Sequence, residues 1–153
     1  MNFAMIFSLS SLLVMPFWFL MIFLPHWRVT KRIIQSPLIS LAPAVVYIIL
    51  VLPLLGEVLP IVSSPDLVDV THLLNSPAGA TIAWLHFLAF DLFVARWIYL
   101  DSREKVISAW VVSPILFLTL MLGPMGFATY LGVRALVNAV RRRSNRPVLH
   151  HAT

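Results

Sequence analysis

The stretch that decides the fold is residues 78–100, AGATIAWLHFLAFDLFVARWIYL, which is apolar over most of its length. At 1.5 Å per residue, a helix of this length spans roughly 35 Å and can cross a hydrocarbon core of about 30 Å. The run also carries His86, Asp91 and Arg96, and ionisable side chains are rare within membrane spans. It therefore predicts a transmembrane helix with an unusual polar content.

Three further apolar runs flank this segment, at about residues 3–24, 37–55 and 106–133. The whole chain is 60% hydrophobic and 11% charged, whereas soluble domains carry about 25% charged residues. This composition excludes a soluble globular protein and an intrinsically disordered one. We expect an all-α integral membrane four-helix bundle, formed by a single domain over residues 1–140 and followed by a basic tail at 141–153.

The last apolar run extends to about Val140 and is too long for one untilted crossing. Gly123-Pro124-Met125-Gly126 interrupts it, which predicts a kinked fourth helix whose break permits close packing. Its final turns then carry Arg134 and the arginines at 141–143 into the head groups. The alternative is a re-entrant pair of half-helices. Four full crossings would place the basic connector at 26–32 and the basic tail on opposite sides, which conflicts with the positive-inside rule.

The other segments give simpler expectations. The run at 3–24 lacks a preceding Lys or Arg and a small-residue cleavage site, so it indicates a helix rather than a signal peptide. Pro43 and Pro53 predict a kinked second helix that faces the interior of the bundle. The connector at 57–75 contains no Lys or Arg, and we expect a short interfacial helix over Val68–Leu74.

Charge and cysteine content limit the partners. The net charge is +5, but the basic residues lie between apolar runs and at the C-terminus, which indicates contact with lipid head groups and no nucleic-acid partner. The chain has no cysteine, which excludes disulfides, thiol nucleophiles and iron–sulfur clusters. A di-iron centre is also excluded, because Asp91 is the one carboxylate at membrane depth.

Asp91 falls close to the midpoint of its span, where a carboxylate costs about 2.5–3.5 kcal/mol on insertion scales. It is therefore expected to face protein or water, to be paired, or to be protonated. It serves either as a structural anchor bonded to hydroxyls or Trp indoles, or as an acid or base. His86 either bonds across helices, transfers protons or ligates a haem or chlorophyll metal. A haem shared with His72 is disfavoured by the intervening Pro77.

His86, Asp91 and Arg96 follow one another at intervals of five residues. Each interval rotates the side chain by about 140° around a helix, so no two of them share a face. Each is expected to contact a different neighbour, which would put this helix at the centre of the bundle. The alternative for Arg96 is that it snorkels toward the interface. Asp101 is expected to cap the helix or to pair with Arg103.

A second pattern places His86, Phe90, Phe93 and Trp97 within about 40° of one another on the helix projection. This pattern is typical of a packing surface or of a lipid-facing aromatic stripe. It also suits the wall of a site for a flat or elongated apolar ligand, such as a polyene or a tetrapyrrole.

Residues 84–98, WLHFLAFDLFVARWI, together with Asp101, resemble the central motif of the abscisic-acid-deficient-4-like family, whose plant members are linked to neoxanthin synthesis. The resemblance covers most of residues 3 to 132. It includes Leu24-Pro25-His26-Trp27, Ala42-Pro43 and Leu122-Gly123-Pro124-Met125-Gly126. Ala95 departs from the pattern, which has Gly before the Arg.

This resemblance implies a multi-pass protein of a bacterial inner or photosynthetic membrane that acts on carotenoids. The reaction implied is a cofactor-independent isomerisation that opens the epoxide of a xanthophyll to an allene, with a carotenoid as ligand and no metal. The substrate itself does not transfer. The candidate catalytic residues are His86, Asp91 and Arg96, and the candidate ligand contacts are Trp84, Phe90, Phe93, Trp97, Gly123 and Pro124.

Two hypotheses of other classes stay open. The chain could be a non-catalytic subunit or assembly factor of a pigment-protein or redox complex, with other membrane proteins or further copies of itself as partners. A small transporter is less favoured, because the other three spans lack charges.

Overall fold

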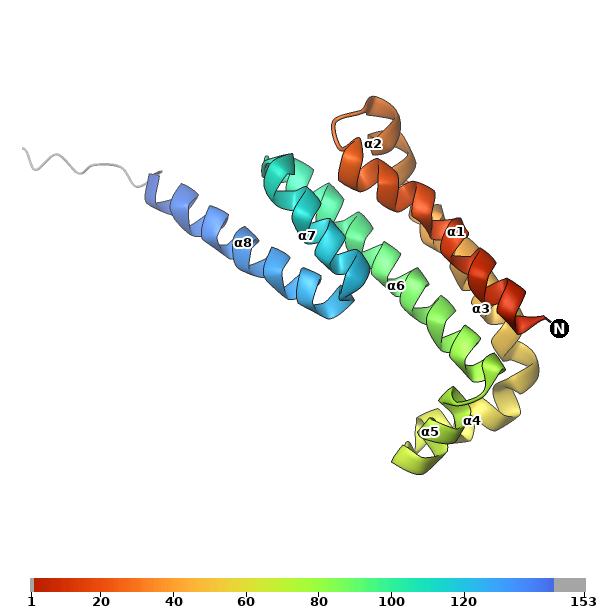
Figure 1. Ribbon diagram of the computed structural model, residues 1–153. Coiled ribbons are helices and arrows are strands. Elements are labelled where there is room, and N and C mark those ends of the chain that lie inside the picture. Colours follow the sequence, from red (N-terminus) through yellow and green to blue (C-terminus); the bar gives the residue numbers. More distant parts are fainter. Residues whose placement is uncertain (1, 145–153) are drawn as a thin grey trace, which may run out of the picture.

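Helices follow one another through residues 2–144, the part of the chain that this computed structural model describes (Figure 1). The α-helices are α1 (Phe3–Phe23), α2 (Arg28–Gln35), α3 (Leu41–Val51), α4 (Leu55–Ser63), α5 (Leu67–Leu74), α6 (Pro77–Glu104), α7 (Ala109–Met121) and α8 (Gly123–Ser144), with 3-10 turns η1 (Pro37–Ser40) and η2 (Leu52–Leu54). No strand occurs within 2–144, so the predicted all-α class is confirmed. Most of the predicted tail lies outside the described residues.

Three helical stretches are long and apolar enough to cross a membrane: Phe3–Phe23, Pro37–Ser63 and Pro77–Glu104. The apolar helix α7 has 13 residues. At 1.5 Å per residue it is about 20 Å long, which is too short for a hydrocarbon core of about 30 Å. The fourth full crossing that the sequence suggested is therefore not present as one helix.

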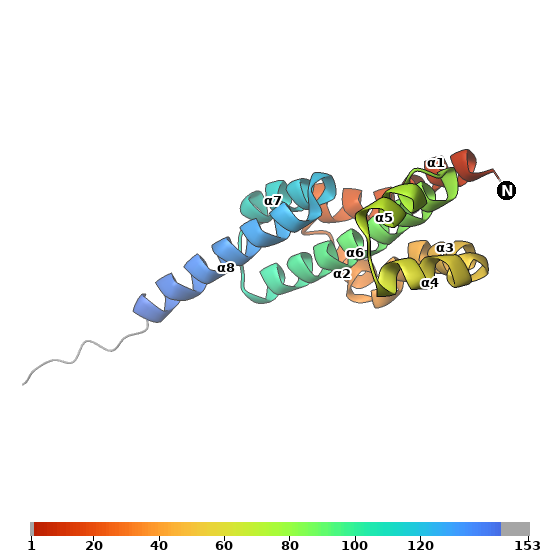
Figure 2. The same cartoon turned by 90° about the horizontal axis from the view of Figure 1, so that it is seen from below.

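Helix α6 lies at the centre of the molecule, as its three ionisable residues predicted. It contacts α1 and α3 on one side and α7 and α8 on the other (Figures 1 and 2). Its start is fixed by Ser76, whose hydroxyl accepts a hydrogen bond from the Gly79 N–H at 2.9 Å. Leu85, Leu92 and Ile98 are fully buried on its packed face, and the opposite face is open.

The second apolar stretch packs against α6 by one face only. Pro53 lies in the 3-10 turn η2, which gives the predicted interruption of the helix. Ile48 and Leu52 are 50% and 64% exposed, so the expectation of an interior-facing helix is wrong. Helix α4 follows where a connector was expected, whereas the predicted short helix at 68–74 is confirmed as α5.

The last apolar run forms a hairpin instead of a kinked helix. The chain reverses at Leu122, whose carbonyl accepts hydrogen bonds from the N–H groups of Met125 and Gly126. A Cβ at Gly126 would overlap the backbone of Thr119 in α7, so this glycine allows the two helices to cross closely. The break at Gly123 is confirmed, and the alternative of two half-helices describes it better than one helix.

The reversal gathers basic segments at one end of the molecule. Nη1 of Arg103 lies 3.3 Å from Nδ1 of His26, and Arg141 donates to the carbonyl of Lys105 at 2.6 Å. The first connector, the connector between α6 and α7, and the far end of α8 therefore lie together, whereas α4 and α5 lie at the other end (Figure 1).

Candidate functional site

Asp91 is half-buried and lies against the first residue of α8. A Cβ built on Gly123 would overlap the Asp91 carboxylate, so the glycine is required for this approach. The N-terminal end of a helix carries a partial positive charge, which favours a nearby carboxylate. Asp91 has no hydrogen bond or ion pair with another side chain within 2–144.

His86 lies on the open face of α6 and is exposed. Its ring stacks on Phe90, with 4.7 Å between the ring centroids, and Tyr47 of α3 lies 5.8 Å away on the other side. Phe90 and Phe93 are 60% and 51% exposed. The predicted aromatic stripe is therefore an outward-facing surface in the middle of α6.

The fourth member of the stripe is covered by α8. The Trp97 ring meets the rings of Phe127 and Tyr130 edge to face, at centroid distances of 5.7 and 5.6 Å. The guanidinium of Arg134 lies 5.7 Å from the centre of the same indole, a cation–π distance. Helix α8 thus closes one end of the aromatic face, and Tyr47 flanks the other.

Two predicted ligand contacts have different surroundings. Trp84 points toward α1, where its indole N–H donates to the Ser11 hydroxyl at 3.3 Å and its ring stacks on Phe7 at 5.3 Å. It is separate from the aromatic face. Pro124 is exposed in the first turn of α8, next to Gly123.

Arg96 binds the end of α2. Its Nε donates to the carbonyl of Ile34 at 2.9 Å, and Nη2 donates to the carbonyl of Gln35. A cation at a helix C-terminus is stabilising, so Arg96 holds α2 in place. The three ionisable residues thus reach three different neighbours, as predicted, and they do not contact one another. Their catalytic roles stay predictions.

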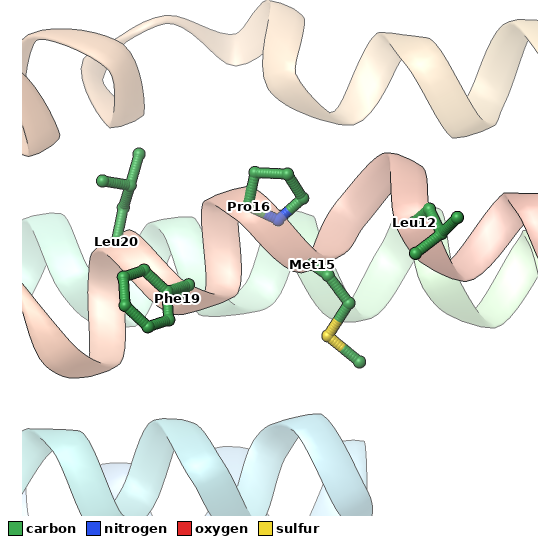
Figure 3. Close-up of a pocket in the computed structure, with 5 residues that line it drawn as sticks. All are labelled: Leu12, Met15, Pro16, Phe19 and Leu20. Atoms are coloured by element: carbon green, nitrogen blue, oxygen red, sulfur yellow. The ribbon is translucent and has the colours of Figure 1, made fainter.

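Hollows of the surface beside α1 lie away from Asp91 and His86. One of about 440 Å³ is formed by α1 alone, around Pro16, from Leu12, Met15, Phe19 and Leu20 (Figure 3). It offers no polar side chain. Another, of about 650 Å³, lies between α1 and α7. The candidate site is therefore an open face of α6 and not an enclosed cavity.

An ionic cluster links α6 and α8. The residues that bind Asp101 in this cluster were not predicted from the sequence. The Tyr130 hydroxyl donates to Asp101 Oδ2 at 2.6 Å, and Arg134 Nε donates to the same oxygen at 2.9 Å. The expected pair of Asp101 with Arg103 is wrong, whereas the placement of Arg134 among head groups stays a prediction. Tyr130 and Arg134 are four residues apart and share a helix face, a signal the sequence contained.

Comparison with known proteins supports the family resemblance of the sequence. A family model described as ABA DEFICIENT 4-like matches residues 5–130. The chain is 27% identical over 139 residues to Protein ABA DEFICIENT 4, chloroplastic, of Arabidopsis thaliana; the match covers 87% of this chain and 62% of that protein. No solved structure matches the chain significantly. The match over residues 5–130 shows that this chain belongs to the ABA DEFICIENT 4-like family.

Proposed function

We propose that this protein is a carotenoid-modifying membrane protein that binds a xanthophyll along the open aromatic face of α6 and isomerises its epoxide to an allene. Family membership supports the link to carotenoids. The observation that carries the site is the position of Asp91, a carboxyl group without a side-chain partner within residues 2–144 that lies against Gly123, on the same helix as the exposed aromatic residues but on a different face. The membrane is a bacterial inner or a photosynthetic membrane.

The geometry suits an elongated apolar ligand. From His86 to Trp97 the face extends about 16 Å along the helix at 1.5 Å per residue. Phe90 and Phe93 offer flat, rigid contact surfaces with little entropy to lose. Tyr47 and Phe127 flank the two ends of this strip, so a polyene would be held lengthwise between α3 and α8.

The reaction requires one acid and one base and no redox change. A proton goes to the epoxide oxygen as its C–O bond breaks, and a proton leaves the adjacent polyene carbon as the allene forms. Asp91 and His86 lie about 140° apart around the axis of α6, so the proposal requires the epoxide end of the ligand to bend around the helix between them, where each side chain is suited to one of these transfers. Substrate and product are isomers, so the reaction balances without a cofactor.

The test is conversion of an epoxy-xanthophyll by the purified protein in liposomes, followed by chromatography and absorbance. Substrate and product are isomers of equal mass, so mass does not separate them. The readout is the absorbance spectrum, because the allene product has a shortened conjugated system. Asp91→Asn and His86→Ala are expected to abolish conversion while xanthophyll is still retained. If Arg96 acts only by holding α2 in place, the substitution Arg96→Gln lowers both the melting temperature and the amount of active protein.

Matched controls come from outside the site. Asp69→Asn and His72→Ala change exposed residues of α5 and are expected to leave conversion unchanged. Normal conversion by both Asp91→Asn and His86→Ala would show that the catalytic assignment is wrong. A wild-type protein that retains no xanthophyll would overturn the proposal as a whole.

A non-catalytic role in a larger complex is the second candidate, and the same exposed aromatic residues favour it. Phe87, Phe90 and Phe93 are each more than half exposed, and a partner helix could cover them. Gentle solubilisation followed by native electrophoresis separates the two proposals. Comigration with a large assembly supports the second one, whereas a small particle that carries polyene absorbance supports the first.

A further inference from the structure

Arg103, at the C-terminal end of α6, has an incompletely satisfied guanidinium group. Its Nε and Nη2 atoms are buried and have no hydrogen-bond partner within residues 2–144. The group lies over the Tyr99 ring at 5.6 Å, and the Tyr99 hydroxyl in turn donates to the carbonyl of Pro25 at 2.9 Å. A buried cation without hydrogen-bond acceptors is costly, so the arrangement calls for an anion.

The one polar neighbour of this group is itself basic. Nη1 of Arg103 lies 3.3 Å from Nδ1 of His26, which has to be a neutral acceptor in that contact. His26 is exposed, so its ring can swing away from the guanidinium. An anionic oxygen that enters there would accept hydrogen bonds from both side chains, and these charge-assisted bonds are strong.

His26 also lines the hollow of about 650 Å³ between α1 and α7. The rest of the lining is almost entirely apolar and includes Ile22, Phe23, Trp110 and Phe117. Trp110 is 90% exposed, and tryptophan favours the level of the lipid head groups. The hollow therefore has one basic lining residue, His26, with Arg103 in contact with it from outside the lining, and the rest of the lining is mostly apolar and continues along α7.

We propose that Arg103 and His26 bind the phosphate of an anionic phospholipid, and that one acyl chain of this lipid lies in the hollow between α1 and α7. The two basic side chains match the charge of the head group, and the apolar lining matches the chain. The lipid would hold the end of α1 against the start of α7. This site is separate from the aromatic face of α6, so it does not depend on the function proposed above.

The test is native mass spectrometry of the purified full chain with phosphatidylglycerol or phosphatidylcholine of identical acyl chains. The wild type is expected to retain phosphatidylglycerol at least about tenfold more tightly, equivalent to the loss of one hydrogen bond to a charged group. Arg103→Gln removes this preference. Arg28→Gln, an equal charge change at an exposed position of α2, leaves it intact.

Further measurements make the test of the lipid site decisive. If Arg103→Gln does not fold, His26→Gln at the surface is measured instead and is expected to weaken phosphatidylglycerol binding several-fold. Inorganic phosphate at millimolar concentration is expected to leave the lipid bound, because it lacks the acyl chain that fills the hollow. Equal retention of the two lipids by the wild type, an equal loss in Arg28→Gln, or displacement by phosphate at millimolar concentration would each overturn the proposal.

Discussion

The Asp91 carboxylate lies so close to the α-carbon of Gly123 that no side chain fits between them. The contact joins the middle of α6 to the reversal of the hairpin between α7 and α8. It also places two residues from the candidate site together, although they are 32 positions apart (123 minus 91).

Gly123→Ala is expected to displace the Asp91 carboxyl group. Overpacking of this kind costs about 1–3 kcal/mol. Xanthophyll conversion should fall about as strongly as in Asp91→Asn. Gly132→Ala is the matched control, because nothing lies within 4 Å of a Cβ at that position and alanine favours the helix. Equal effects of the two substitutions on conversion would contradict the role of this contact.

Val106→Gly is expected to stabilise the protein. Val106 has φ 48°, a left-handed conformation that costs an L-residue about 1–2 kcal/mol. The N–H of Ile107 bonds to the carbonyl of Ser102, and the N–H of Val106 to that of Arg103, which is the Schellman arrangement that favours glycine. Val106 is 79% exposed, so little packing is lost.

The expected gain is about 1 kcal/mol, after allowance for the larger unfolded-state entropy of glycine. Unfolding in mixed detergent micelles measures it. Val111→Gly, an exposed valine within α7, should instead lose about 1 kcal/mol. A gain in both variants would show that the backbone of Val106 is not the cause.

Tyr130→Phe is expected to destabilise the attachment of α8. The Tyr130 side chain is fully buried, and its hydroxyl donates to Asp101. Loss of a hydrogen bond to a charged group costs about 1.5–3 kcal/mol. Tyr47→Phe is the control, because the Tyr47 side chain makes ring contacts but its hydroxyl has no hydrogen bond among the described residues. The same unfolding assay should show less than half the effect for Tyr47→Phe, and an equal loss would contradict the assignment.

The hairpin predicts an odd number of full crossings. The chain has no cysteine, so single cysteines at Ser64, Ser108 and Ser144 can be labelled with a membrane-impermeant thiol reagent. We expect Ser108 and Ser144 to react from the same side and Ser64 from the opposite side. Four full crossings would instead place Ser144 with Ser64. The expected pattern puts the basic connectors on one side, which satisfies the positive-inside rule.

The central helix and the isolation of its ionisable residues could be predicted from sequence. The length of the apolar run fixed the helix, and the five-residue spacing showed that His86 and Asp91 could not share a face. The stacking of His86 on Phe90 also follows from their four-residue separation. These are local features, and helix geometry alone determines them.

The contacts across the hairpin could not be predicted in the same way. A glycine and a proline indicate a break, but they do not set the angle between the two helices. That angle decides whether Asp101 meets Arg134 or Arg103. The contact of Trp84 with α1 could not be predicted for a related reason, because the position of α1 determines which side of α6 is covered.

The reversal at Leu122 also has a consequence for biogenesis. Synthesis proceeds from the N-terminus, so α6 leaves the ribosome before Gly123 can meet Asp91. Until the ribosome has released the final helix, the nascent chain carries a carboxyl group at membrane depth without its helical neighbour. Completion of the candidate site is thus coupled to completion of the polypeptide, and a prematurely terminated product would be left with an exposed defect that membrane quality-control proteases can recognise.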